Sequence, residues 1–310
     1  MSDPRPFDAV ATRILADQAF SRTAGASLVH GNAVRLLKDA RENYPAWIAA
    51  MEQAKETIHF ECYILHDDAV GARFSDLLLR KAKEGVRVRI VYDWLGGWQT
   101  RGRFWRRLRE GGIEVRCFNR PRIDDPLGAL VRDHRKCVVV DGRVAFVFGL
   151  CVGQAWEGYP EKKLAGWRDT GVEIRGPAVA DVARAFAETW AACGEALPAG
   201  GLPPPAALAD QGDVSLRVVA TTSGTSELFR LDSLVAALAR GTLWLTDAYY
   251  AGTPSYVQAL RAAAGDGVDV RLLVPGRGSD IKLMQTISRA GICSASSGMW
   301  VTTPTRRSPP

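Results

Sequence analysis

One short segment has the residue types and the spacing for chemistry on a phosphate ester. His134, Lys136 and Asp141 form the pattern His-x-Lys-x4-Asp within the run DHRKCVVVDG. Alternate side chains of a β-strand share a face, so His134 and Lys136 are expected side by side, with the intervening residue pointing the other way. A neutral imidazole can attack phosphorus, and an ammonium group beside it can hold the anionic oxygens.

Asp141 is expected to have a partly structural role. Asp141-Gly142 lies between two β-rich runs, 136–140 and 144–148, and Asp-Gly in that position predicts a two-residue hairpin turn. The Asp141 carboxylate can cap the turn backbone and also help to position His134 and Lys136. On the motif alone, a pair of surface residues without function stays open as the alternative, although the full pattern before an apolar strand is more specific.

The elements that must position this segment alternate between strand and helix, which indicates a layered α/β fold. Glycines follow two of the expected helices in the position of a C-terminal cap. Strands are expected at 57–64, 86–92 and 113–118, and helices at 71–84, 103–110 and 179–193.

The second half of the chain repeats the first. A Pro/Ala/Gly-rich linker spans 195–212, and beyond it Thr242-Leu-Trp-Leu matches Thr57-Ile-His-Phe. Gly267-Val-Asp-Val-Arg-Leu-Leu likewise matches Gly85-Val-Arg-Val-Arg-Ile-Val. A duplicated α/β unit is expected to place a site where its halves meet.

Composition narrows the class of protein. The 310 residues carry a formal charge of +6 and are 47% hydrophobic, which excludes a disordered or fibrous chain. No run reaches the roughly 18 apolar residues of a membrane span, and the N-terminus lacks the features of a secretory signal. Six cysteines without a CxxC pair favour reduced thiols over zinc or disulfides. Acid–base chemistry with histidine must use one of four residues: His30, His59, His66 and His134.

Several ordered runs together resemble the phospholipase D superfamily, and within it the bacterial cardiolipin synthase branch. The resemblance extends from Gly31 to Gly194 and resumes from Leu216 to Gly291. It rests on GNAVRLL, HFECYILHDD, AKEGVRVRIVYDWLGG, RDHRKCVVVDGRVAFVFG and WRDTGVEIRGPAV.

The resemblance implies a duplicated α/β/α sandwich whose second repeat is incomplete. The expected division of the chain is a leader at 1–45, a first repeat at 46–194 and the linker at 195–212, followed by a partial second repeat at 213–291 and an irregular tail at 292–310.

The resemblance also implies a two-step transfer without metal or other cofactor. A histidine attacks the phosphodiester of a phospholipid, and an alcohol or water then displaces the phosphohistidine while a second histidine serves as acid and base. By position, His134 is the nucleophile and Lys136 the phosphate-binding lysine. Asp169 matches an acidic residue that orients a catalytic histidine, and Glu61 would be a supporting polar group. A simple surface carboxylate is the alternative for both Asp169 and Glu61.

Two departures from the family pattern stand out. Where the family has a Gly-Gly/Ser-x-Asn turn around the phosphate, this chain has Gly149 and then Cys151, whose thiol is a weak donor. The matching second histidine would fall beyond Pro310, and no histidine follows His134. The expectation is a truncated or frame-shifted second repeat and little turnover by this chain, with rescue by a homodimer not indicated.

The expected function is phosphatidyl transfer of the cardiolipin synthase type, with phosphatidylglycerol as donor and acceptor. The expected location is cytoplasmic, peripheral to the inner face of the cell membrane. An arginine-rich helix with aromatic residues, around 101–109, suits an anionic membrane, and an ordinary solvated helix with a buried apolar side is its alternative. Two other functions remain open: a nuclease of the same superfamily, and a catalytically silent membrane- or protein-binding remnant.

Overall fold

The computed structural model describes residues 9–121, 131–204, 208–222, 226–274 and 300–302. The described chain forms two compact units, one of residues 27–225 and the other of residues 1–26 together with 226–310. Each unit is described by itself. Most of the expected tail, 292–310, lies outside the described residues, and so does Cys293.

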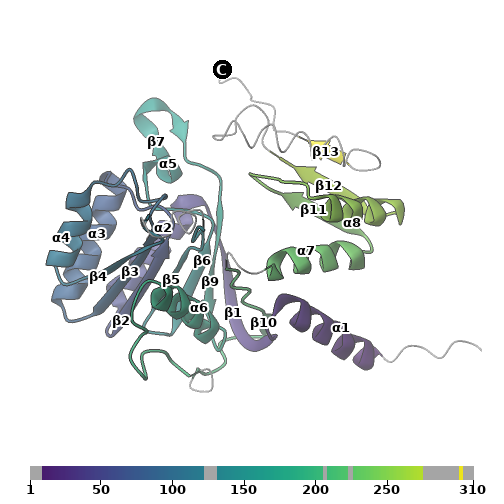
Figure 1. The fold of residues 1–310 in the computed structure, drawn as a ribbon, viewed down its shortest axis with the longest axis horizontal. Coiled ribbons are helices and arrows are strands. Elements are labelled where there is room, and N and C mark those ends of the chain that lie inside the picture. The colour runs from purple at the N-terminus through teal and green to yellow at the C-terminus, as the bar shows by residue number, and fades with distance from the viewer. Residues whose placement is uncertain (1–8, 122–130, 205–207, 223–225, 275–299, 303–310) are drawn as a thin grey trace, which may run out of the picture. The chain divides into compact units, whose positions relative to one another are not determined.

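An eight-stranded sheet forms the centre of the larger unit (Figure 1). Its parallel part is β2-β3-β4, and every other neighbouring pair is antiparallel. The strands, in spatial order, are β10 (Val214–Leu216), β1 (Val29–Lys38), β9 (Thr170–Arg175), β6 (Val144–Phe148), β5 (Cys137–Val140), β2 (Thr57–Cys62), β3 (Arg87–Asp93) and β4 (Glu114–Phe118).

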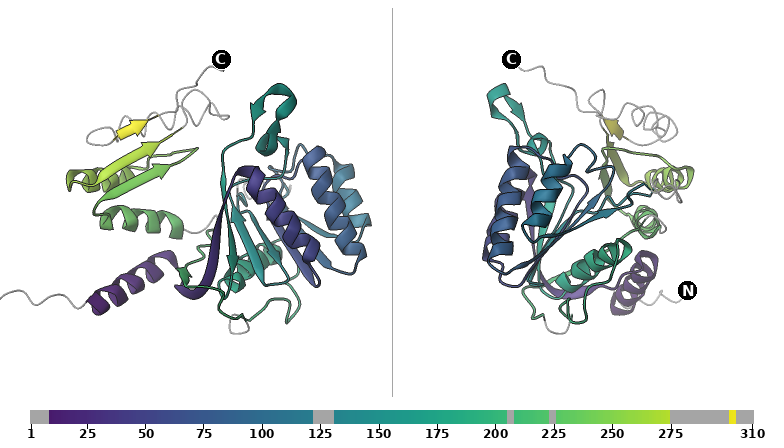
Figure 2. Two further views of the ribbon diagram at one scale, coloured as in Figure 1. Left: turned by 180° about the vertical axis from the view of Figure 1, so that it is seen from behind. Right: turned by 60° about the vertical axis from the view of Figure 1, so that its left-hand side comes forward.

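Helices cover both faces of this sheet, as the right-hand view of Figure 2 shows. One face carries α2 (Asp39–Gln53), α3 (Ala69–Lys83) and α4 (Gly102–Glu110), and the other carries α6 (Val179–Ala192). Between β6 and β9 the chain forms the short α5 (Gln154–Glu157) and a projecting hairpin of β7 (Gly158–Tyr159) and β8 (Leu164–Ala165). A 3-10 turn, Pro160–Lys162, lies at the hairpin tip. The α/β/α arrangement is the fold class predicted from the sequence.

The apolar run of β5 reflects burial on both faces. Val138 and Val140 enter the core under α2, α3 and α4, where Trp47 and Phe74 also lie. Val139 enters the core under α6. Because a strand covered on both sides needs apolar side chains at every position, its sequence shows no polar alternation.

The predicted hairpin turn at Asp141-Gly142 is confirmed. Asp141 and Gly142 both have positive φ, 51° and 61°, and the Arg143 N–H donates to the Val140 carbonyl at 3.0 Å. This is the turn geometry that Asp-Gly favours, because aspartate tolerates the left-handed region and glycine adopts it freely.

The expected leader, 1–45, is not a separate segment. Helix α1 (Ala9–Ala24) belongs to the smaller unit, whereas β1 pairs with β9 over six residues inside the large sheet. The boundary near 213 also differs, because β10 pairs with β1 and so belongs to the first unit. Strands β1 and β10 are placed by pairing with strands that are distant in the sequence. Local composition cannot predict such pairing.

The smaller unit contains a three-stranded parallel sheet with helices of its own. Its β11 and β12 pair from Thr242 with Asp269, just as β2 and β3 pair from Thr57 with Arg87. The two β-α-β segments therefore share order and register at the positions that the sequence repeat aligns. Besides α1, its described elements are α7 (Glu227–Leu238), β11 (Thr242–Thr246), α8 (Pro254–Gly265), β12 (Asp269–Leu273) and β13 (Trp300–Thr302).

Helix α4 directs its apolar side into the protein. Phe104, Trp105 and Leu108 are buried, and the Trp105 ring stacks on Tyr92 with 3.7 Å between centroids. The apolar residues of this helix are therefore buried, as the solvated-helix interpretation expects, and α4 has no apolar face left for a membrane. None of the described helices combines the length and apolar character needed to cross a bilayer.

Candidate active site

His134 and Lys136 lie together just before the first residue of β5. Both contact the ring of Tyr63, which follows β2: the His134 ring is 4.6 Å away between centroids, and the Lys136 Nζ is 5.3 Å from the same ring. The Lys136 Nζ also donates to the His134 carbonyl at 2.7 Å. The arrangement is the one predicted from the alternation of a strand.

The His134 imidazole is held neutral and accessible. Its side chain is exposed to solvent, yet nearby protein atoms still desolvate it and lower its pKa to about 4. The Lys136 ammonium lowers the pKa further, and Asp93 opposes the shift. Because the charged form is disfavoured, a nitrogen lone pair is available for attack at neutral pH.

Lys136 supplies a positive charge and hydrogen-bond donors that can bind a phosphate. The residue is 6% exposed, so its charge is poorly screened by water. One of its three ammonium protons goes to the His134 carbonyl, which leaves two for the oxygens of a phosphate. This is the geometry of a cation that binds an anionic group beside a nucleophile.

Asp169 is packed against Gly149 at the start of β9. A Cβ at Gly149 would lie 2.1 Å from the Asp169 Oδ1, so only glycine leaves room for the carboxylate. The Thr170 N–H donates to that oxygen at 2.8 Å. Burial raises the pKa of Asp169, while the Thr170 hydrogen bond and the Lys136 ammonium oppose the rise. The charge of Lys136 thus acts on both Asp169 and His134.

Cys151 occupies the position where the family pattern has asparagine, and its thiol is directed at another thiol. Cys151 and Cys62 are both buried and free, and they share a hydrogen bond. Burial raises the pKa of Cys62 well above its usual range. For Cys151 burial acts in the same direction, but the hydrogen bond from Cys62 and the Lys136 ammonium outweigh it and lower the pKa.

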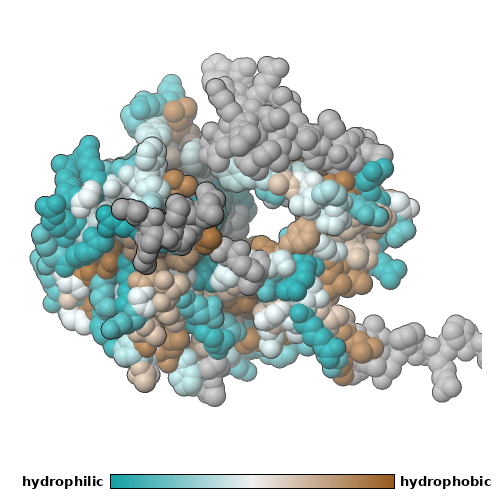
Figure 3. Space-filling view, in the orientation of Figure 1, coloured by the Kyte–Doolittle hydropathy of each residue, from teal (hydrophilic) through white to brown (hydrophobic). Residues whose placement is uncertain are grey.

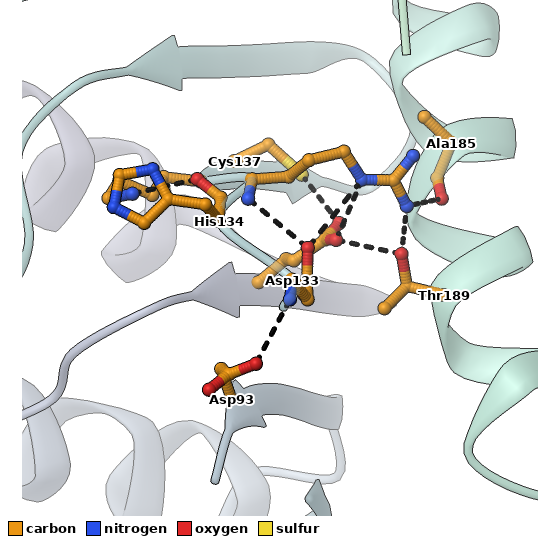
Figure 4. A network of polar contacts seen from close by, with 9 residues as sticks. Asp93, Asp133, His134, Cys137, Ala185 and Thr189 are labelled. Carbon is orange, nitrogen blue, oxygen red and sulfur yellow. Dashed lines mark hydrogen bonds and ion pairs between the residues drawn. The ribbon is translucent and has the colours of Figure 1, made fainter. Parts of the chain in front are cut away.

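Glu61 lies on the opposite face of the sheet, where it is bound by Thr189 of α6, one of the residues labelled in Figure 4. Its carboxylate is fully buried, so the interpretation as a surface carboxylate is wrong. The Arg135 Nε approaches its Oε1 at 3.1 Å, and the Thr189 hydroxyl donates to the same oxygen at 2.8 Å. Arg135 also donates to the Ala185 carbonyl at 2.8 Å. Glu61 therefore fixes the residue between His134 and Lys136 and contacts neither of those two.

Two further carboxylates hold this segment, and the sequence analysis missed both. Asp93, at the end of β3, accepts from the Asp133 N–H at 2.9 Å and from the Arg132 guanidinium at 2.9 Å. Burial and the neighbouring Glu61 carboxylate raise the pKa of Asp133 to about 8. Their positions in the sequence could have indicated this role, because Asp93 ends an apolar strand and Asp133 directly precedes the motif.

Asp141 lies at the other end of β5. Its carboxylate accepts three backbone N–H groups, those of Lys55, Glu56 and Thr57, each at 2.8 Å. The structural role is as expected, but the carboxylate binds the segment that leads into β2 and not the turn backbone that the sequence indicated. Its carboxylate makes no hydrogen bond to His134 or Lys136 among the described residues, so any help in positioning them acts through the backbone of β5.

The other three histidines have separate environments. His59 is buried under α6 and stacks on Phe186 with 4.6 Å between centroids, as expected for a structural histidine. His30 Nδ1 lies 2.6 Å from the Ser215 hydroxyl, and His66 lies 6.3 Å from the ring of Trp156. Among the described residues, no group of three or more His, Cys, Asp or Glu side chains converges as a metal site requires.

Comparison with curated proteins supports the same family. A family model described as the phospholipase D-like domain of cardiolipin synthase matches residues 47–150. Cardiolipin synthase A of Pseudomonas aeruginosa is 36% identical over 271 residues, which cover 84% of this chain and 53% of the relative. Cardiolipin synthase A of Pseudomonas putida is 36% identical over 257 residues, covering 79% and 51%. The chain thus spans about half the length of these relatives.

Solved structures show the same fold at low identity. A phosphatidylserine synthase of Haemophilus influenzae superposes with a TM-score of 0.64 at 13% identity, over 92% of this chain and 76% of that one. A polyphosphate kinase of Porphyromonas gingivalis gives 0.54 at 14% identity, over 97% and 46%. The solved structures agree in fold, and the family model with the sequence relatives shows that residues 47–150 form a phospholipase D-like domain of the cardiolipin synthase family.

Proposed function

We propose that this chain transfers a phosphatidyl group through a covalent phosphohistidine on His134, with phosphatidylglycerol as donor and acceptor. The observation that carries the proposal is the pairing of an accessible, neutral His134 with the poorly screened Lys136 ammonium on the same side of the strand. An imidazole of lowered pKa is poised for attack, and the ammonium stabilises the charge that develops on the phosphate.

In the first step a ring nitrogen of His134 forms a bond to phosphorus, and the bond from phosphorus to the glycerol oxygen of the headgroup breaks. The departing glycerol takes a proton from a general acid. In the second step a hydroxyl of another phosphatidylglycerol attacks phosphorus and gives its proton to the same group. The P–N bond then breaks, and cardiolipin and the free imidazole remain.

The scheme also needs a general acid, and His134 cannot serve as one because it is bonded to phosphorus. His59, His30 and His66 have the separate environments described above, and the sequence has no histidine after His134. We therefore assign His134 to the covalent step, with a histidine from outside these 310 residues as the proton donor. Without that donor the departing alkoxide is a poor leaving group, so steady turnover by this chain alone should be low.

The test is a search for the covalent intermediate. The purified chain is incubated with phosphatidylglycerol in mixed micelles, and its intact mass is measured at alkaline pH, where phosphohistidine survives. We expect the mass of one phosphatidyl group to be added in the wild-type chain, with the modified peptide containing His134. The adduct should be lost in His134→Ala and retained in the matched control His66→Ala.

Nucleic acid is tested in parallel as the other phosphodiester. Cleavage of single-stranded DNA that disappears in His134→Ala, with no lipid adduct, would replace phosphatidyl transfer by nuclease chemistry. Absence of both reactions at His134 would leave the chain a binding module and overturn the proposed function.

A further inference from the structure

We propose that the β7–β8 hairpin and the loop at 94–100 form a docking rim that seats the active site on an anionic phospholipid bilayer. This inference rests on the proposed function only in taking a phospholipid as the substrate that has to reach His134. The rim residues are Leu95 and Trp98 of the loop, Lys162, Lys163 and Leu164 of the hairpin, and Trp167 just after the hairpin.

Large apolar side chains of the rim are exposed to solvent over about half of their surface or more. Trp98 is 67% exposed, Leu164 56%, Trp167 50% and Leu95 44%. The hairpin projects from the unit in Figure 1, and in the space-filling view it shows a hydrophobic patch between hydrophilic side chains (Figure 3). Tryptophan and leucine presented on projecting segments suit the boundary between headgroups and acyl chains.

The charge of the rim complements an anionic surface. Lys162 and Lys163 follow Glu161 at the hairpin tip, and neither lysine pairs with a carboxylate in the described part of the chain. Near the other rim segment, Arg101 and Arg103 share a single carboxylate, that of Asp67, at 3.9 and 3.8 Å. Both segments thus keep an excess of positive charge, which attracts acidic lipids.

Both rim segments connect directly to the active site. Trp167 lies two residues before Asp169, and its ring packs on Trp156 at 5.0 Å between centroids. On the other side, one Asp93 carboxylate accepts from the Leu95 N–H at 2.8 Å and from the Asp133 N–H at 2.9 Å. Docking of the rim would therefore place the headgroup layer close to the segment that carries His134.

The loop at 94–100 is also fixed to the chain that follows β2. The Thr100 hydroxyl donates to the Leu65 carbonyl at 2.6 Å, and Leu65 forms an isolated bridge with Val152. Trp98 is thus presented by an anchored loop. An anchored apolar side chain loses little conformational freedom on insertion, which favours binding.

The experiment measures co-sedimentation of the intact chain with vesicles. Wild type should bind vesicles of phosphatidylglycerol and phosphatidylcholine, and bind pure phosphatidylcholine much more weakly. Leu164→Ser with Trp167→Ser, and separately Trp98→Ser, should each weaken binding by about tenfold or more. Lys162→Gln with Lys163→Gln should weaken binding only to the anionic vesicles, by roughly tenfold.

The matched control is Trp244→Ser. Trp244 is 64% exposed, nearly as much as Trp98, but belongs to the smaller unit. Vesicle binding should be unchanged in this variant. Circular dichroism melting of every variant reports whether it is folded, and two independent apolar variants keep the test decisive if one of them unfolds.

A second readout separates this inference from the proposed function. Short-chain phosphatidylglycerol below its critical micelle concentration offers the headgroup without a bilayer, so rim variants should form the His134 adduct at the wild-type rate. Three results would each overturn the proposed docking rim. They are wild-type vesicle binding by all rim variants, no vesicle binding by the wild-type chain, and an equal loss of binding in Trp244→Ser. Absence of the adduct in a wild-type chain that still binds through the rim would overturn only the proposed function.

Discussion

The ring of Tyr63 lies edge-on to the ring of His134, with an interplanar angle of 61° and 4.6 Å between centroids. The same ring lies 5.3 Å from the Lys136 ammonium. One aromatic side chain at the end of β2 therefore touches both groups of the motif. The contact is the kind by which packing limits the rotamers of a nucleophile before substrate binds.

Tyr63→Ala should slow formation of the His134 adduct, because both side chains lose the surface that orients them. We expect a loss of roughly tenfold to a hundredfold. Tyr63→Phe keeps the ring and should stay close to wild type. Single-turnover mass spectrometry measures both rates, and an equal loss in the two variants would assign the effect to the hydroxyl instead of the ring.

The first chemical step should be insensitive to mild acid. An ordinary histidine has a pKa of 6.5, whereas that of His134 is lowered to about 4, so the imidazole stays unprotonated as the pH falls from 7 to 5. The rate of adduct formation should be flat across that window and fall as the pH approaches 4. A loss centred near pH 6.5 would contradict the burial argument.

The contribution of Lys136 to that shift can be measured directly. Lys136→Gln removes the ammonium and should move the pKa of His134 upward, toward but not to its ordinary value, because the desolvation remains. Titration of the His134 ring by NMR provides the measurement, with the wild-type chain as the reference. A downward movement would show that another group controls the shift.

Gly149→Ala should disturb Asp169 more than it disturbs the fold. The new methyl group would meet the Asp169 Oδ1 at 2.1 Å, and the carboxylate must move away. We expect a loss of adduct formation on the order of tenfold or more, since small misplacements are costly at a reacting centre. Gly241→Ala is the control, because a Cβ there meets nothing within 4 Å.

Asp141→Ala should cost stability without changing the chemistry at His134. The carboxylate accepts three backbone N–H groups, and their loss together with the strain of alanine at positive φ should lower the free energy of unfolding by about 3 kcal/mol. Asp141→Asn tolerates the same φ and keeps one acceptor, so it should lie between. Urea unfolding followed by tryptophan fluorescence compares the three chains.

Glu61→Gln should be far more destabilising than Glu52→Gln. Glu61 is fully buried, and its neutralisation leaves the largely buried Arg135 side chain with only the more distant Asp133 carboxylate, at 3.8 Å, at a cost of about 3 kcal/mol. Glu52 pairs with Arg80 at 3.2 Å with both side chains half exposed, so its neutralisation should change little. Thermal melting of the two variants provides the comparison. Equal melting temperatures would show that Glu61 is not an essential partner.

The sequence predicts most local structure of the larger unit, because periodicity and turn chemistry are local. The Asp141-Gly142 turn and the shared side of His134 and Lys136 follow from two rules: the φ preferences of two residues and the alternation of a strand. The two-sided burial of β5 likewise follows from its unbroken apolar run.

What the sequence does not predict depends on which strands are neighbours. Tyr63 meets His134 because β5 pairs with β2, and Asp93 reaches Asp133 from the next strand along. The distance between Asp141 and Lys136 also needs the fold: at about 3.3 Å per residue, an extended β5 separates them by roughly 16 Å. The motif is contiguous in sequence, but its members act at two ends of a strand.

Hydrogen bonds attach both ends of β5 to neighbouring segments. Asp141 binds the segment that enters β2, and at the other end Asp133 is held by Asp93. Opening this strand requires both attachments to break, so its amide protons should exchange with deuterium only through global unfolding. On heating, His134 would therefore keep its place until the whole unit melts, and loss of the covalent step would report the melting of the fold itself.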